Sequence, residues 1–394
     1  MINKRILLFP LLWVSTIFYS CSESPTSIGN DLLIPDYVNV FKLDSYQDSV
    51  QQSSTYFKTR IKLSDSPRLF LGSFGNIDTA ASLIRFAIGL PDSIKNEILN
   101  SNLNILSSRV KLTKVYSIGD SSAPLSFSVH SVTSGWTSLG FNADSLQSLQ
   151  YDAADISSNF SYSDTVYSFD ISTQTVASWF TAAADTAIPT DKGIFLKPNP
   201  NSNRIIGFDA VNVNLVGIPS LTVVIQKPGV YTDTLTFYSI EDVSAIAGIK
   251  PVLPAGDIAV QAGLAVHSRI YFNVISIPKG SVINKAQLTL YLDSAATKTG
   301  DNYANSLTAY FIKDSSANSY DTTSGIVLGR VQNYFTGDIV KFIQSIVSGF
   351  HSNQGIIIAA GGQNLGVDLY ALKGSGAPET FLRPRLVITY TGRK

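Results

Sequence analysis

The sequence predicts an all-β protein of two tandem, jelly-roll-like antiparallel β-sandwiches, each with one short helix. Short stretches alternate apolar and polar residues, as half-buried strands do, and Gly, Pro, Asn, Asp and Ser bound them. Only 15% of the residues are charged, which is typical of extracellular β-proteins and unusual for a cytosolic enzyme. The order of features in residues 55–227 also recurs in residues 258–392.

Alternation marks strands most clearly at residues 125–130, 287–292 and 386–390. Helical spacing is rare. The clearest apolar stripe follows i, i+3, i+4, i+7 and i+8, at Ile339, Phe342, Ile343, Ile346 and Val347. Asp338 stands where it can cap the start of this helix, and a second helix is expected near residues 171–179.

The recurring order predicts two diverged copies of one sandwich. Each copy has a strand that leads to a proline, two further strands, a helix, a strand that starts at Gly, and a final β-rich strand. The first copy places its strands at residues 85–91, 108–112, 125–132, 193–196 and 221–225. The second places them at residues 271–278, 286–291, 307–312, 355–358 and 386–390. Chance alignment of short β-motifs is the alternative explanation.

The N-terminus has the pattern of a bacterial lipoprotein signal. Lys4 and Arg5 precede an apolar run over residues 6–19, which is shorter than the roughly 20 residues of a membrane-spanning helix. Cys21 follows a small residue and is the single cysteine of the chain. Residues 1–20 are therefore expected to be a signal peptide and Cys21 the lipidated residue. An ordinary signal peptide with an incidental cysteine is the alternative.

These observations divide the chain into segments. We expect a lipid-anchored tether over residues 21–36 and the first sandwich over residues 37–227. Residues 228–257 are either a linker or extra strands, and the second sandwich covers residues 258–394. Positive and negative residues balance, which argues against nucleic acid as a partner.

The sequence carries few of the groups that catalysis needs. It has three histidines and no Gly-x-Ser-x-Gly motif, so a Ser-His-Asp triad is not expected. With one cysteine and no paired histidines, zinc is not expected either. Asp314, Asn318 and Asp321 share a loop and supply the hard oxygens that calcium prefers. They are either a structural calcium site or a solvated loop, and no other cofactor is expected.

Aromatic residues are the best candidates for ligand binding, because ring faces can stack on the C–H faces of sugars. Trp136 follows a strand and precedes a Gly-containing stretch, so it is either buried or part of a binding site. Tyr303, Tyr310 and Tyr320 flank loops of the second copy and could form a platform.

Residues 277–291 (IPKGSVINKAQLTLY) and 383–390 (RPRLVITY) resemble a DNRLRE-type domain. Trp136 matches the tryptophan of that family in the first copy, where Ile-Pro-Ser-Leu at 218–221 replaces Arg-Pro-Arg-Leu. Residues 27–35 (SIGNDLLIP) resemble the opening of an uncharacterised lipoprotein family, the domain of unknown function 4270. The first resemblance implies a jelly-roll-like β-sandwich of exported bacterial proteins. Some of its relatives are carbohydrate-binding modules beside polysaccharide lyases, and others are spacers or adhesin-like units.

The sequence thus predicts a non-catalytic cell-envelope lipoprotein, anchored by lipid, with the outer membrane as the expected location. It would act as a surface or periplasmic interaction module that binds polysaccharide or envelope proteins. A scaffold subunit of an envelope complex is the first alternative. A polysaccharide hydrolase or lyase is the second, and it requires two carboxylates close together in a groove.

Overall fold

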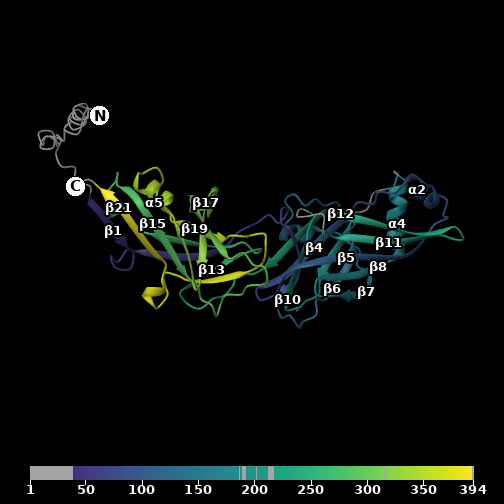
Figure 1. Cartoon of the computed structure of the whole chain (residues 1–394), viewed down its shortest axis with the longest axis horizontal. Coiled ribbons are helices and arrows are strands. Elements are labelled where there is room, and N and C mark those ends of the chain that lie inside the picture. The colour runs from purple at the N-terminus through teal and green to yellow at the C-terminus, as the bar shows by residue number, and fades with distance from the viewer. Residues whose placement is uncertain are drawn as a thin grey trace, which may run out of the picture.

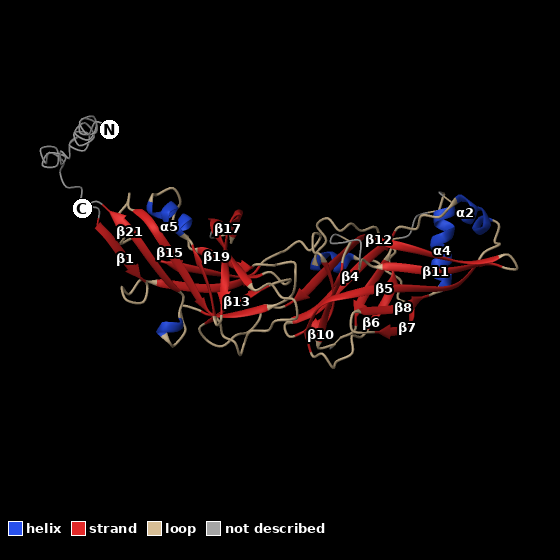
Figure 2. Cartoon of the chain, viewed as in Figure 1, coloured by secondary structure: helices blue, strands red, loops and turns tan. Residues whose placement is uncertain are grey.

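The computed structural model describes residues 39–392, except residues 186, 189–191, 201, 212–216, 315 and 317. Strands form two large antiparallel sheet systems, and Figure 2 shows few helices beside them. The predicted all-β sandwich fold is therefore confirmed. The expected signal peptide, Cys21 and the tether at residues 21–36 lie outside the described residues. No helix in the described part is long and apolar enough to span a bilayer.

The first sheet system, which we call the C-terminal sandwich, has the strand order β1-β21-β15-β18-β17-β16-β19-β14-β13-β20, with β2 beside β14. Its strands are β1 (Asn39–Asp44), β2 (Gln52–Lys58), β13 (Asp257–Gln261), β14 (Val266–Phe272), β15 (Val282–Tyr291), β16 (Ser306–Asp314), β17 (Ser319–Val331), β18 (Tyr334–Asp338), β19 (Ile356–Ala360), β20 (Leu369–Lys373) and β21 (Arg385–Gly392).

The second, which we call the inserted sandwich, has the order β10-β3-β4-β12-β11-β5-β8-β7, with β9 between β4 and β6. Its strands are β3 (Arg68–Phe74), β4 (Ile77–Phe86), β5 (Asn104–Gly119), β6 (Phe127–Ser131), β7 (Ser157–Tyr162), β8 (Val166–Ile171), β9 (Ile194–Pro198), β10 (Arg204–Asp209), β11 (Ser220–Lys227) and β12 (Tyr231–Gly248).

The division between the sandwiches differs from the expected boundary at residue 37. β1 and β2 come first in the chain, but they pair with β21 and β14 and so belong to the C-terminal sandwich. The other sandwich is inserted between β2 and β13. β12 falls within residues 228–257 and pairs with β11 and β4, so this region supplies an extra strand. Alternation along a strand is local and does not reveal which sheet the strand joins.

Equivalent strand pairs support the prediction of two diverged copies. The pairs β4–β9, β6–β9, β5–β11, β5–β8 and β7–β8 correspond to β14–β19, β16–β19, β15–β21, β15–β18 and β17–β18. Gly193 and Gly355 precede β9 and β19 with φ of +88° and +89°. A Cβ atom would lie 2.3 Å from the Ile84 carbonyl oxygen at Gly193 and 2.6 Å from the Ile270 carbonyl oxygen at Gly355.

The two copies close their sheets with different parts of the chain. β12 pairs with β11 along its first half and with β4 along its second half. In the C-terminal sandwich two separate strands take these places. β1 pairs with β21, the equivalent of β11, and β2 pairs with β14, the equivalent of β4. The described start of the chain thus completes the second copy. Residues 39–54 precede the first copy in the sequence, and residues 55–58, which were expected to open it, belong to β2 of the C-terminal sandwich.

The helices lie between strands of both sandwiches. The predicted stripe forms α5 (Val340–Val347), and Asp338 accepts a hydrogen bond from the Val340 amide at 3.0 Å. The second expected helix is α4 (Thr173–Ala184), with Ser172 as its N-cap. The inserted sandwich also has α2 (Asp92–Leu99) and α3 (Ala143–Ser148), so it carries three described helices instead of one. A single-turn 3-10 helix, η3 (Thr380–Leu382), precedes β21.

Each sandwich has its own apolar core, and a further apolar core joins the two sandwiches, which lie end to end in Figure 1. Its buried side chains are Leu63, Phe70, Ile77, Ala80, Tyr116, Ile118, Ile205, Ile246, Ala259, Leu264, Val266, Val367 and Leu369. Backbone contacts cross the same junction, since the Asp301 amide donates to the Ser117 carbonyl at 2.9 Å. The junction is therefore packed and hydrogen-bonded, unlike a free linker.

A buried carboxyl group makes the stability of the inserted sandwich depend on pH. Asp242 on β12 is 3% exposed, and its carboxylate accepts hydrogen bonds from the Val211 amide at 2.9 Å and the Ser239 hydroxyl at 3.3 Å. Burial is the main cause that raises the pKa of Asp242 to about 6. Between pH 4 and pH 6 the folded chain therefore binds more protons here than the unfolded chain, and stability falls as the pH rises.

We expect Asp242→Asn to remove this pH dependence. The asparagine oxygen can still accept from Val211, so the variant should match the wild type near pH 4 and exceed it by roughly 2–3 kcal/mol at pH 7. Urea unfolding of both proteins from pH 4 to pH 8 measures the difference. Asp233→Asn, at an exposed position of the same strand, is the control. A difference between variant and wild type that does not change with pH would contradict the prediction.

Candidate functional site

Trp136 is half-buried and has structural partners. Its ring nitrogen donates to the Lys192 carbonyl oxygen at 2.6 Å, and the Arg85 guanidinium lies 4.7 Å from its ring centroid. Arg85 in turn pairs with Glu241 at 2.8 Å. Both the polar atom and one side of the ring are thus occupied by the protein, although Trp136 also borders a hollow of about 250 Å³ next to Phe141.

The structure brings together two of the three predicted tyrosines. The ring centroids of Tyr310 and Tyr320 are 5.0 Å apart, and both rings are half-buried. Tyr303 instead packs against the core of the C-terminal sandwich, and its hydroxyl accepts a hydrogen bond from Arg330 at 3.3 Å. The structure thus brings Tyr310 and Tyr320 together and gives Tyr303 other partners, and Trp136 lies in the other sandwich.

The predicted calcium residues are engaged in local turns. Asp314 accepts from the amide and the hydroxyl of Ser316 at 2.9 and 2.7 Å. Asp321 accepts from the amide and the hydroxyl of Thr323 at 3.1 and 2.8 Å, and these bonds lower the pKa of Asp321. Asn318 has a φ of +51°, a turn conformation. Within the described residues no group of three or more His, Cys, Asp or Glu gathers, and calcium remains a prediction.

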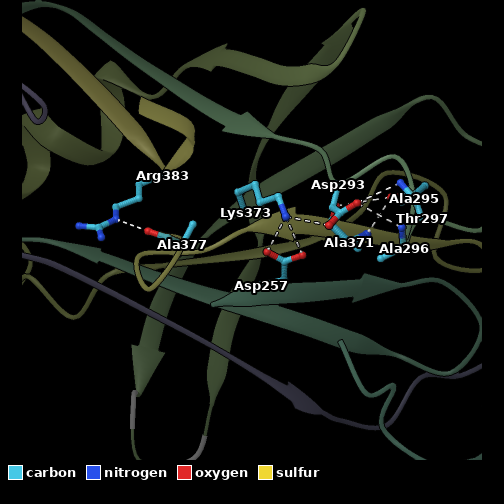
Figure 3. Close-up of polar contacts among 9 residues, drawn as sticks. All are labelled: Asp257, Asp293, Ala295, Ala296, Thr297, Ala371, Lys373, Ala377 and Arg383. Atoms are coloured by element: carbon cyan, nitrogen blue, oxygen red, sulfur yellow. Dashed lines mark hydrogen bonds and ion pairs between the residues drawn. The ribbon is translucent and has the colours of Figure 1, made fainter. Parts of the chain in front are cut away.

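One pair of carboxylates does lie close together, around Lys373 at the end of β20 (Figure 3). The Lys373 ammonium is 3.1 Å from Asp257 and 2.7 Å from Asp293. Asp293 also accepts hydrogen bonds from the Ala295 and Ala296 amides at 2.9 and 3.2 Å. The bond to Lys373 lowers the pKa of Asp293 to about 2, while burial raises the pKa of Asp257. This triad links β13, β20 and the segment after β15.

An aromatic cluster lies at the edge of the inserted sandwich, where β7 ends the strand order. β7 and β8 form a hairpin in which Tyr162 is opposite Tyr167, with ring centroids 4.5 Å apart. Phe160, two residues before Tyr162, contacts Phe127 and Phe169 with centroid distances of 5.2 and 5.6 Å. These rings share the face of the hairpin that is turned toward the core.

We call the hollow lined by Phe127, Phe160, Tyr162, Tyr167, Phe169, Arg204 and residues 121–125 the edge pocket. Its volume is about 350 Å³. Phe169 and Tyr167 are buried, whereas Phe160 is 53% exposed and Tyr162 is 56% exposed. Both exposed rings lie on β7, the outermost described strand of this sheet, and both buried rings lie on its neighbour β8. Exposed apolar side chains gathered around a hollow mark a binding surface.

Arg204 forms one wall of the edge pocket and holds the neighbouring loop. This side chain is only 5% exposed. Its guanidinium donates to the Ser121 and Ala123 carbonyl oxygens at 3.1 and 3.4 Å and to the Ser117 hydroxyl at 3.2 Å. The loop between β5 and β6 is therefore fixed beside the rings, so the pocket is formed before any ligand binds.

Sequence reasoning missed the edge pocket, although a signal for the hairpin was present. Phe-Ser-Tyr at residues 160–162 and Tyr-Ser-Phe at 167–169 flank a Ser-Asp-Thr turn. This alternation predicts a hairpin with four rings on one face. The alternation does not show which of these rings are exposed, because exposure depends on how far the rest of the sandwich covers each strand.

No family model, curated protein or solved structure matches the chain. The fold and the site define the class of protein: two joined β-sandwiches, one inserted into the other, with an aromatic pocket at the edge of the inserted one. The resemblances to DNRLRE-type domains and to the domain of unknown function 4270 remain predictions.

Proposed function

We propose that the chain is a non-catalytic lipoprotein of the bacterial cell envelope that binds polysaccharide through the edge pocket. The observation that carries the proposal is the half-exposure of Phe160 and Tyr162 beside buried rings. Aromatic faces of this kind can stack on the C–H faces of a sugar ring. The pocket volume of about 350 Å³ falls in the range of roughly 300–1,000 Å³ that small-ligand sites occupy.

The arrangement of the two sandwiches supports the proposal. Figure 1 shows β1 at the end of the molecule opposite the tip of the inserted sandwich. Cys21 precedes β1 in the chain, so a lipid on this residue would place the C-terminal sandwich nearest the membrane. The inserted sandwich would then extend outward, where long polysaccharide chains can reach it.

The charged triad supports a non-catalytic role. A glycoside hydrolase needs one protonated carboxyl group and a second, ionised one on either side of the scissile bond. Here the Lys373 ammonium lies between Asp257 and Asp293 and binds both. Each carboxylate thus has a structural partner that a substrate would have to displace.

Binding of the soluble chain from Ser22 onward to a panel of bacterial, algal and plant polysaccharides tests the proposal. We expect saturable binding, which Tyr162→Ala and Phe160→Ala each weaken by roughly 3–10-fold. Tyr238→Ala is the matched control, because Tyr238 lies in the same sandwich and is 53% exposed, against 56% for Tyr162.

Equal binding by all three variants would remove the edge pocket from the proposal. If no polysaccharide binds, the scaffold alternative becomes the better hypothesis. Capture of partners from membranes by the intact lipoprotein, with and without Tyr162→Ala, would then show whether envelope proteins use the same edge.

A further inference from the structure

The end of the C-terminal sandwich formed by β1, β21 and the start of β15 carries exposed apolar side chains. In the strand register, Val40 and Val282 lie on either side of Thr391. Val40 is 68% exposed and Val282 is 58% exposed. Figure 1 shows the start of β1 and the end of β21 together at this end of the molecule.

A pair of lysines stands beside the valines on the same sheet face. Lys42 and Lys285 lie on either side of Thr389, two residues along β21 from the valine row. Two residues of a strand span roughly 7 Å and return to the same face. Lys42 is 3.8 Å from Asp44, but Asp44 is already bound by Arg385 at 2.6 Å. Lys42 keeps 56% of its side chain exposed, and Lys285 is exposed as well.

Helix α5 lies beside the start of β15, and the loops next to these elements carry exposed apolar side chains. Gln344 of α5 accepts from the Ile283 amide at 2.8 Å and donates to the Ser281 carbonyl at 3.2 Å, which places α5 beside the start of β15. The loop after α5 carries Phe350, 80% exposed, and the loop before β15 carries Ile275, 87% exposed.

We propose that this end, the base of the molecule, rests on an anionic phospholipid bilayer. Val40 and Val282 enter the boundary between headgroups and acyl chains, and Lys42 and Lys285 meet the headgroup phosphates. The spacing of roughly 7 Å between the rows fits the 5–10 Å depth to which interfacial segments bury. The choice of a bilayer rests on the proposed lipoprotein function, because the segment that carries Cys21 joins the described chain at this end, at Asn39.

Vesicle sedimentation of the soluble chain from Ser22 onward tests the proposal without the lipid anchor. The wild type should bind mixed phosphatidylethanolamine and phosphatidylglycerol vesicles, and high salt should weaken this binding. Val40→Ser combined with Val282→Ser should lower the partition coefficient roughly tenfold or more. Lys42→Glu combined with Lys285→Glu should reduce binding to these vesicles but not to phosphatidylcholine vesicles.

Val230→Ser is the matched control, because Val230 is 67% exposed in the turn between β11 and β12, at the opposite end. Equal losses for this control and the double valine variant, or no vesicle binding by the wild type, would overturn the proposal. A wild-type dimer in light scattering that the valine substitutions dissociate would assign the base to a second copy instead. Polysaccharide binding is tested with Tyr162→Ala and vesicle binding with the valine and lysine variants. Either proposal can therefore fail without the other.

Discussion

Gly355→Ala is expected to lower the free energy of unfolding by about 3–5 kcal/mol. Gly355 has a φ of +89°, a conformation that costs a residue with a Cβ atom about 1–2 kcal/mol. The added Cβ would also lie 2.6 Å from the Ile270 carbonyl oxygen. Ile270 pairs with Ile356 in the middle of the sheet, so neither backbone can move away without breaking the ladder.

Gly349→Ala separates the two causes, because Gly349 has a φ of +77° but no atom within 4 Å of the added Cβ. This control should lose only about 1–2 kcal/mol. Guanidinium unfolding of both variants measures the difference, and equal losses would show that the steric contact costs nothing. Gly193→Ala should behave like Gly355→Ala, because its Cβ would lie 2.3 Å from the Ile84 carbonyl at the equivalent place in the other copy.

The elements that were predicted correctly are those encoded by local pattern. The alternation at residues 125–130 corresponds to β6, and the stripe from Ile339 to Val347 corresponds to α5 with Asp338 at its start. When one face of an element is buried, apolar residues recur every two residues in a strand and about every 3.6 residues in a helix. Each pattern can be seen in the element's own sequence. The repeat was visible for the same reason, because each copy conserves the order of its local patterns.

The partners of strands could not be predicted in this way. β1 and β2 alternate no differently from strands of the inserted sandwich, yet they pair with residues more than two hundred positions later. The register that joins Val40 to Thr391 depends on the completed sheet and leaves no local trace in either segment.

The candidate site failed to emerge from the sequence for a related reason. Residue type and nearness to loops favour Trp136 and the three tyrosines as ligand-binding residues. Whether an aromatic residue is available to a ligand depends on what covers it. Arg85 lies over Trp136, whereas Phe160 and Tyr162 lie on the outermost described strand of their sheet and are about half exposed.

Tyr116→Ala is expected to uncouple the two sandwiches. Tyr116 is fully buried in the junction core, and its hydroxyl donates to Asp368 at 3.1 Å and accepts from the Val367 amide at 3.2 Å. Asp368 also accepts from the Gly300 amide at 2.8 Å. Tyr116 of the inserted sandwich thus contacts Val367 and Asp368 of the C-terminal sandwich directly, and Asp368 in turn binds the segment at Gly300. The loss of Tyr116 removes a large buried ring, which costs about 3–5 kcal/mol, and leaves Asp368 without one partner.

Hydrogen exchange at the Asp301 amide, which donates across the junction to Ser117, measures the uncoupling. In Tyr116→Ala this amide should exchange about 100-fold faster or more, while amides inside each sandwich change far less. Phe208→Ala is the control, because Phe208 is equally buried but lies within the core of the inserted sandwich. If both variants accelerate exchange at Asp301 equally, Tyr116 acts only through general stability. A selective effect would show that Tyr116 holds the junction between the two sandwiches closed.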